Sequence, residues 1–112
     1  MAGYYLGENN TEQIVKEILS NDTVRITNGL LLLFMNNIDK DLAIQYAKWA
    51  MNSDILEIKK LGIIGMGHIA RVYGLDSINC FDTEIKMIEQ TNDVDLIGIL
   101  ADAKDDFSVF VK

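Results

Sequence analysis

Residues that cap helices recur along this chain, and each precedes a stretch in which apolar residues lie three or four positions apart. Apolar residues at this spacing share one face of a helix, and an Asn or Asp side chain accepts hydrogen bonds from the free N–H groups at the helix start. The pattern predicts six helices, with caps at Asn10, Asp22, Asp39, Asp54, Asp82, and either Asn92 or Asp93. Asp54 is followed three residues later by Glu57, which completes a capping-box pattern.

The chain contains no proline. A protein of this length that is rich in loops and strands normally contains several, whereas a compact helical protein can do without. The 112 residues, nearly half of them apolar, are enough for one core. We therefore predict a single all-α domain over residues 1–112, with residues 1–8 loosely ordered. Because the connections between helices are short, we expect neighbouring helices to pack antiparallel.

A faint internal repeat supports this arrangement. Three tripeptides follow a cluster of Asn, Ser and Asp residues and begin a long apolar helix: Val24-Arg25-Ile26, Leu56-Glu57-Ile58 and Val94-Asp95-Leu96. Their offsets of 32 and 38 residues are typical of helical-hairpin repeats, in which no unit can bury its apolar face alone. We therefore expect about three antiparallel hairpins that stack into an α-α superhelix.

The segment LGIIGMGHIAR at residues 61–71 allows two interpretations. Gly65-x-Gly67-x-x-Ala70 fits the fingerprint of a dinucleotide-binding fold, in which a strand leads through a glycine-rich loop into a helix. Only six residues separate Gly67 from Gly74, however, which is less than two helical turns, and no strand-like run follows Asp82. A dinucleotide-binding fragment is therefore the lesser alternative, and we expect no cofactor.

If residues 55–73 form one helix, their spacing divides them between two faces. One face carries Ile55, Ile58, Gly62, Gly65, Ile69 and Val72, and the other carries Glu57, Lys60, Ile64, His68 and Arg71. Each glycine inside a helix costs about 1 kcal/mol relative to alanine. Close approach of a neighbouring helix, or of a partner's backbone, would offset that cost. Gly74 is expected to cap the end of this helix.

The net charge and the single Cys and His residues exclude several classes of function. The net charge of −7 argues against direct binding of nucleic acid or of anionic membranes, and it favours a basic protein partner, although it also keeps a small protein soluble. Cys80 and His68 are the only residues of their kinds, which excludes a multi-cysteine zinc site. Their surroundings match no nucleophile signature, so we expect no catalytic residue and interpret Cys80 as a small packing residue. The start shows no signal-peptide pattern and no apolar run could span a bilayer, so a cytoplasmic location is expected.

The second half of the chain carries motifs in a recognisable order. Gly67-His68-Ile69-Ala70-Arg71 is followed by Gly74-Leu75-Asp76, by a helix, and by a final helix that ends in Ala101-Asp102-Ala103-Lys104-Asp105-Asp106-Phe107. This order resembles small bacterial HEAT-like proteins that act as immunity proteins beside polymorphic toxins, including those of contact-dependent growth inhibition systems. The Gly-Leu-Asp turn is shorter here than in the family, and Asp102 and Lys104 interrupt the apolar run of the final motif.

The resemblance implies a compact HEAT-like α-solenoid that binds one cognate toxin domain and neutralises it by occluding its active or substrate-binding surface, without catalysis. The toxin of such a protein is often a nuclease, whose nucleic-acid site is basic, and this would fit the net charge of −7. A small HEAT-like adaptor for another protein is the alternative.

The candidate partner-binding residues lie on the fourth and sixth predicted helices. Asp95, Asp102 and Asp106 are spaced for one face of the last helix, and Asp105 lies beside them. Carboxylates placed in this way repel one another, so they form either a solvated surface or an acidic patch for the partner's Lys, Arg or His. Their spacing fits no calcium loop, and no metal is expected.

His68 and Arg71 lie on the polar stripe of the fourth helix, where they either contact the partner or serve the fold. A structural hydrogen bond for His68 and an ion pair between Arg71 and a carboxylate of the final helix are the alternatives. Tyr46 and Trp49 are interpreted as core residues, with Trp49 a candidate anchor if it is exposed.

Overall fold

The computed structural model describes residues 10–36, 39–73 and 80–109, with the side chains of residue 10 and of residues 106–109 left out. Within these ranges the chain forms six α-helices and no strand, which confirms the all-α prediction: α1 (Asn10–Ile18), α2 (Thr23–Met35), α3 (Lys40–Met51), α4 (Leu56–Tyr73), α5 (Asp82–Glu89) and α6 (Val94–Val109). Residues 61–64, the strand that a dinucleotide-binding fold would need, lie inside α4, so that alternative is wrong. The predictions for residues 1–8 and for the turn at Gly74 concern residues outside the described ranges.

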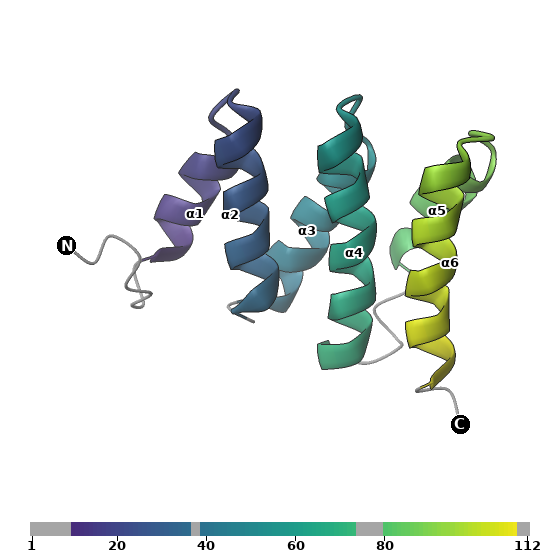
Figure 1. The fold of residues 1–112 in the computed structure, drawn as a ribbon. Coiled ribbons are helices and arrows are strands. Elements are labelled where there is room, and N and C mark those ends of the chain that lie inside the picture. Colours follow the sequence, from purple (N-terminus) through teal and green to yellow (C-terminus); the bar gives the residue numbers. More distant parts are fainter. Residues whose placement is uncertain (1–9, 37–38, 74–79, 110–112) are drawn as a thin grey trace.

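The six helices form three hairpins arranged in two layers (Figure 1). The inner layer consists of α2, α4 and α6, and the outer layer consists of α1, α3 and α5. The central helix α4 contacts α2, α3 and α6. The molecule measures 42 × 32 × 18 Å, and the shortest dimension fits two helical layers, because packed helices lie roughly 8–10 Å apart.

Three of the predicted helix caps are confirmed. One carboxylate oxygen of each capping residue accepts a backbone N–H of the first turn: Asp22 from Val24 at 2.9 Å, Asp39 from Leu42 at 3.0 Å, and Asp93 from Asp95 at 3.0 Å. The last of these decides between Asn92 and Asp93 as the cap of α6. These bonds satisfy N–H groups that the helix itself leaves without a partner.

The other three cap predictions, at Asp54, Asp82 and Asn10, are wrong. Helix α4 begins at Leu56, and the Lys59 N–H donates to the Ile55 carbonyl, so Ile55 rather than Asp54 occupies the capping position. Helix α5 begins at Asp82 itself, behind Phe81, whose side chain makes no capping hydrogen bond. Asn10 is likewise the first residue of α1 rather than the residue before it.

The turns within the three hairpins, α1–α2, α3–α4 and α5–α6, share one local hydrogen bond. The hydroxyl oxygens of Ser20, Ser53 and Thr91 each accept the backbone N–H two residues on, at 3.3, 3.0 and 3.2 Å. These residues are 33 and 38 positions apart, so the first offset of the structural repeat is one residue longer than the tripeptides indicate. In the first and third turns an Asn follows in the left-handed region, Asn21 at φ 65° and Asn92 at φ 61°; Asn tolerates that conformation better than most residues.

Close helix approach explains two of the glycines in α4. A Cβ on Gly62 would lie 2.7 Å from the Met51 backbone N and 2.9 Å from the Ala47 carbonyl O, both in α3. A Cβ on Gly65 would overlap the ring of Phe34 in α2. The neighbouring helices of this chain, and not a partner's backbone, therefore occupy the space beside both residues.

The core runs between the two layers. It includes Ile14, Ile18, Ala43, Tyr46, Ala47, Ala50, Ile58, Ile69, Leu96, Leu100 and Ala103, all buried. Ile55 and Val72, which the spacing places on the same face as the buried Ile58 and Ile69, are instead 41% and 42% exposed, and Leu19 is 56% exposed. Leu19 directly follows α1, Ile55 directly precedes α4, and Val72 is the last residue but one of α4. Cys80, interpreted above as a packing residue, is also exposed, and the adjacent Phe81 fills the core.

Candidate functional site

The solvent side of the inner layer carries one stripe of exposed residues on each helix. The outer helices cover the other side of this layer, so the three stripes face the same solvent (Figure 1). We call this surface the open face and define it by Val24, Leu31 and Met35 of α2, Glu57, Ile64 and Arg71 of α4, and Asp95, Gly98, Asp102 and Asp105 of α6, all exposed. Their spacing of three, four or seven positions places each set along one side of its helix.

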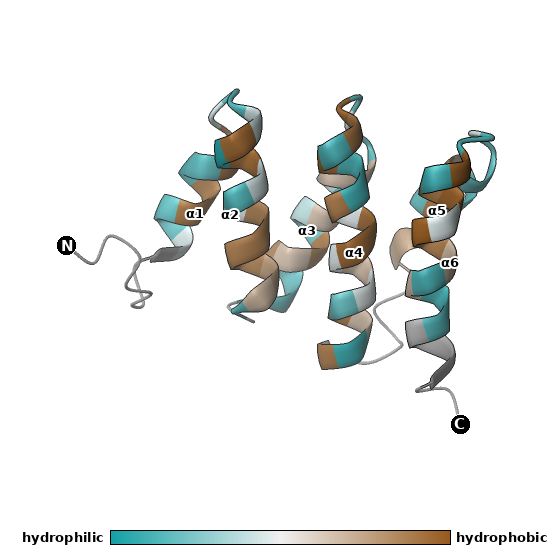
Figure 2. Cartoon of the chain, viewed as in Figure 1, coloured by the Kyte–Doolittle hydropathy of each residue, from teal (hydrophilic) through white to brown (hydrophobic). Residues whose placement is uncertain are grey.

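The open face combines apolar and acidic regions. Val24 and Met35 on α2 are 66% and 68% exposed, and Ile64 on α4 is 54% exposed. Figure 2 shows hydrophobic residues along much of α2 and α4 and hydrophilic residues over the lower part of α6. Apolar side chains therefore border the carboxylates of the last helix.

The predicted acidic residues lie where the sequence places them, on the exposed side of α6. Asp95, Asp102 and Asp105 are exposed, whereas the side chain of Asp106 lies outside the described residues. Neither carboxylate of Asp95 and Asp102 forms an ion pair within the described ranges, where the two ion pairs given join Glu17 to Arg25 and Glu89 to Lys104. The choice between a solvated surface and a partner contact stays open.

Of the two predicted residues on α4, Arg71 is exposed and His68 is half-buried. Arg71 forms no ion pair with the described carboxylates of α6, so the proposed internal partner for it is absent from that part of the chain. Both residues share the stripe that contains Ile64, as the spacing predicts.

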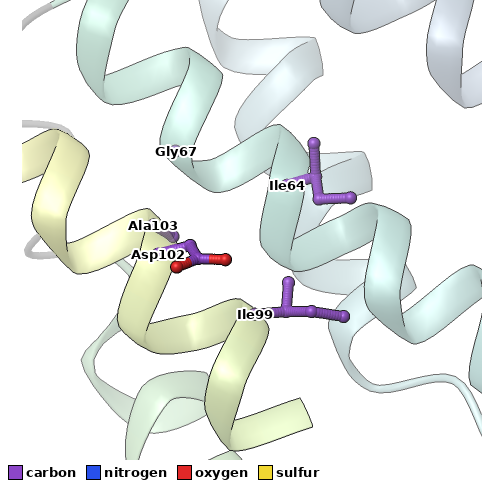
Figure 3. A pocket seen from close by; sticks show the side chains of 5 residues that line it. All are labelled: Ile64, Gly67, Ile99, Asp102 and Ala103. Atoms are coloured by element: carbon purple, nitrogen blue, oxygen red, sulfur yellow. The ribbon is translucent and has the colours of Figure 1, made fainter. Parts of the chain in front are cut away.

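A small pocket lies between α4 and α6 on the open face. Ile64 and Gly67 of α4 and Ile99, Asp102 and Ala103 of α6 line it, and its volume is about 180 Å³. Figure 3 shows the Asp102 carboxylate pointing into the space between the two helices, beside the side chain of Ile99. The pocket therefore has apolar walls and one carboxylate at its edge.

Sequence reasoning missed part of this site. The sequence gives no functional indication for Ile99, and Gly67 stands out only as a glycine of the motif in α4. A signal existed in the spacing, because Ile64 and Gly67 lie three positions apart on one side of α4, as Ile99 and Asp102 do on α6. The exposed apolar residues of α2 were also unremarked.

Trp49 lies away from the open face, on α3 of the outer layer. It is 38% exposed, and its ring meets Tyr46 edge-on at 6.1 Å between ring centroids, with the planes at 73°. Tyr46 is buried as predicted, whereas Trp49 is not a core residue. Trp49 is thus exposed enough to meet the condition for a candidate anchor, but it lies on the outer layer, so a Trp49 variant tests whether the partner binds there instead of at the open face.

The buried polar groups of the described chain lie elsewhere. One oxygen of Glu84 in α5 accepts a hydrogen bond of 3.3 Å from the Asn52 amide, and the other has no partner. Burial, aided by the nearby Asp39, raises the pKa of Tyr73 above its usual range. No group of three or more His, Cys, Asp or Glu side chains among the described residues is placed to hold a metal ion, and no described helix is long and apolar enough to cross a membrane.

The chain matches no model of a known protein family, no curated protein and no solved structure. The likeness of its motifs to HEAT-like immunity proteins therefore stays an expectation from the sequence. What the open face offers chemically is apolar contact area next to carboxylates, and these groups suit the binding of a surface that is itself apolar and basic.

Proposed function

We propose that this protein is an immunity protein that binds a cognate toxin, of the nuclease class, through the open face. The bound protein occludes the toxin's active or substrate-binding surface. The observation that carries the proposal is the exposure of Met35 and Ile64, at 68% and 54%, on the same face as the carboxylates of α6. Contiguous apolar residues at the surface of a small protein mark interaction sites.

The apolar part of the open face supports binding of a protein rather than a small molecule. Leu31 and Met35 lie on α2, and Ile64 lies on the next helix of the layer, so the apolar residues extend over two helices. Methionine has an unbranched, flexible side chain that fits irregular surfaces, and it is enriched in protein interfaces.

The acidic part favours a basic partner. Asp95, Asp102 and Asp105 are exposed along α6, and the net charge of the chain is −7. Carboxylates opposite a basic surface accelerate association and reject acidic competitors. A nuclease must present Lys and Arg to its substrate, so its nucleic-acid site would complement this helix. A cytoplasmic location belongs to the same proposal.

Native mass spectrometry of the tagged chain, purified after co-expression with the adjacent upstream reading frame, tests the proposal. We expect a one-to-one complex with a basic protein that is toxic when expressed alone. The Met35→Asp variant should weaken this complex by about tenfold or more, because it places a charge within the apolar contact. The matched control is Trp49→Ala, an exposed aromatic residue of the outer layer, which should leave the affinity unchanged.

Three outcomes would contradict the proposal. A chain that purifies alone would remove the toxin as its partner. A complex with a non-toxic protein would favour the HEAT-like adaptor and reject the immunity function. A complex weakened by Trp49→Ala but not by Met35→Asp would place the interface on the outer layer. Circular dichroism of both variants ensures that the losses compare folded proteins.

A further inference from the structure

We propose that the pocket between α4 and α6 receives a single Lys or Arg side chain, which anchors the partner on the open face. The inference rests on the proposed function only in assigning that side chain to a partner protein. The pocket itself is a property of this chain and is testable without the partner.

The walls of the pocket fit a long aliphatic stem. Ile64 stands on one side and Ile99 on the other, and neither Gly67 nor Ala103 brings a long side chain into the space between them. Lysine and arginine bury their methylene groups along apolar surface of this kind while the charged end stays near water. Ile64 is 54% exposed, so the pocket opens to solvent, where such a charged end remains hydrated.

The charge at the edge of the pocket selects the end group. Among the described residues that line the pocket, Asp102 is the only ionisable one, and Figure 3 shows its carboxylate pointing towards α4. A guanidinium or ammonium group at the end of an aliphatic stem would meet this carboxylate. An anionic side chain would meet repulsion there, and an entirely apolar one would leave the carboxylate next to it partly desolvated.

The cations among the described residues leave Asp102 available. Asp102 forms no hydrogen bond or ion pair within the described chain, and Lys104, two residues on, binds Glu89 of α5 instead. Lys60 and Arg71 lie on α4, but neither lines the pocket. Asp95, seven residues earlier on the same side of α6, adds negative charge without entering the pocket and so attracts a cation towards it.

The size of the pocket argues for one side chain rather than a free metabolite. Its volume of about 180 Å³ lies below the roughly 300–1,000 Å³ of sites that enclose small-molecule ligands. A dinucleotide or a nucleotide would not fit, whereas the end of a single long side chain would.

Nuclear magnetic resonance of the isolated chain with n-butylguanidinium as the probe tests the pocket. We expect the backbone amide resonances of Ile99, Asp102 and Ala103 to shift and to saturate at about millimolar probe, the range of the weakest specific affinities. Guanidinium ion lacks the stem and N-butylurea lacks the charge, so neither should produce saturating shifts. Asp102→Asn should abolish saturation, and Asp41→Asn, the same substitution at an exposed residue of α3 in the outer layer, should retain it.

Saturating shifts with N-butylurea equal to those with n-butylguanidinium would overturn the assignment of the charge, and so would an Asp102→Asn variant that still binds the probe. Absence of any saturating shift at these residues would overturn the pocket as a binding site.

Once the toxin is identified, Asp102→Asn should weaken the complex by about tenfold or more, and Asp95→Asn by less. If the probe binds but no toxin complex forms, the proposed function fails alone, whereas a toxin complex insensitive to Asp102→Asn means that the anchor inference fails alone.

Discussion

At the residue scale, alanine substitutions at two glycines are expected to change stability in opposite directions. A Cβ on Gly62 would lie 2.7 Å from a backbone nitrogen of α3, which cannot move without shifting that helix, whereas a Cβ on Gly98 in α6 would meet nothing within 4 Å. We therefore expect Gly62→Ala to lower the free energy of unfolding by about 1–3 kcal/mol through overpacking. Gly98→Ala should raise it by up to about 1 kcal/mol, because alanine is the better helix former.

Urea-induced unfolding, monitored by far-ultraviolet circular dichroism, measures the free energy of unfolding of both variants. Each variant serves as the control for the other, since the same substitution is made in two helices of the same layer. An increase in stability for both variants would mean that α3 and α4 do not approach as closely at Gly62 as the structure has them.

Local chemistry decides which of the individual residues were predictable. Asp22, Asp39 and Asp93 cap their helices as expected, because capping involves only the next two or three residues. Asp54 fails because the Ser53 hydroxyl already accepts the Ile55 N–H and sets the turn, so the helix starts one residue later. Exposure depends on the packing of distant helices: Cys80 and Trp49 lie at the surface, and their own neighbours in sequence do not reveal it.

At the scale of elements, the hairpin of α1 and α2 has an ion pair whose contribution depends on pH. The Glu17 carboxylate accepts hydrogen bonds from Arg25 Nε at 3.0 Å and Nη2 at 2.9 Å, and these bonds hold the pKa of Glu17 below its ordinary value of 4.5. A lowered folded-state pKa contributes stability above the unfolded-state pKa, and this contribution is lost as the pH falls through the folded-state value.

The Arg25→Gln variant should therefore be less stable than the unmodified chain at neutral pH, by a small amount because the pair is exposed. The difference should shrink as the pH falls below 4.5 and vanish once Glu17 is protonated. Urea unfolding of both proteins across this range measures it. A difference that stays constant with pH would assign the effect to the packing of the Arg25 stem rather than to its charge.

The identity of the helices was predictable from the sequence, but their mutual arrangement was not. Spacing of apolar residues predicts α4 as a helix despite its glycine motif, and three antiparallel hairpins follow from the short connections. The pocket, in contrast, requires that Ile64 of α4 lie level with Asp102 of α6, and this depends on how far one helix is displaced along the other. No periodicity within a single helix contains that displacement.

At the scale of the whole molecule, α4 is the helix that joins the hairpins. It contacts α2, α3 and α6, whereas α1 packs mainly on α2. Amide groups exchange slowly where opening them requires disruption of much of the fold, and fast where an element detaches alone. We therefore expect the slowest hydrogen exchange at Ile63, Met66 and Ile69 of α4 and much faster exchange in α1.

Hydrogen exchange of the isolated chain, measured residue by residue, checks this order. Equal protection of α1 and α4 would mean that the molecule opens only in one step. Greater protection in α6 than in α4 would instead place the most stable part of the fold in the last hairpin.

The shared turn also bears on how such a chain changes length over evolutionary time. Ser20 and Ser53 begin equivalent turns, and Gly29 and Gly62, likewise 33 residues apart, admit the outer helix of their own hairpins. A tandem duplication of residues 20–52 would join Asn52 to a second copy of Ser20, which would take the place that Ser53 has in the native turn. The gene could thus gain a hairpin in one event, and the longer protein would offer a wider surface on which new specificities could arise.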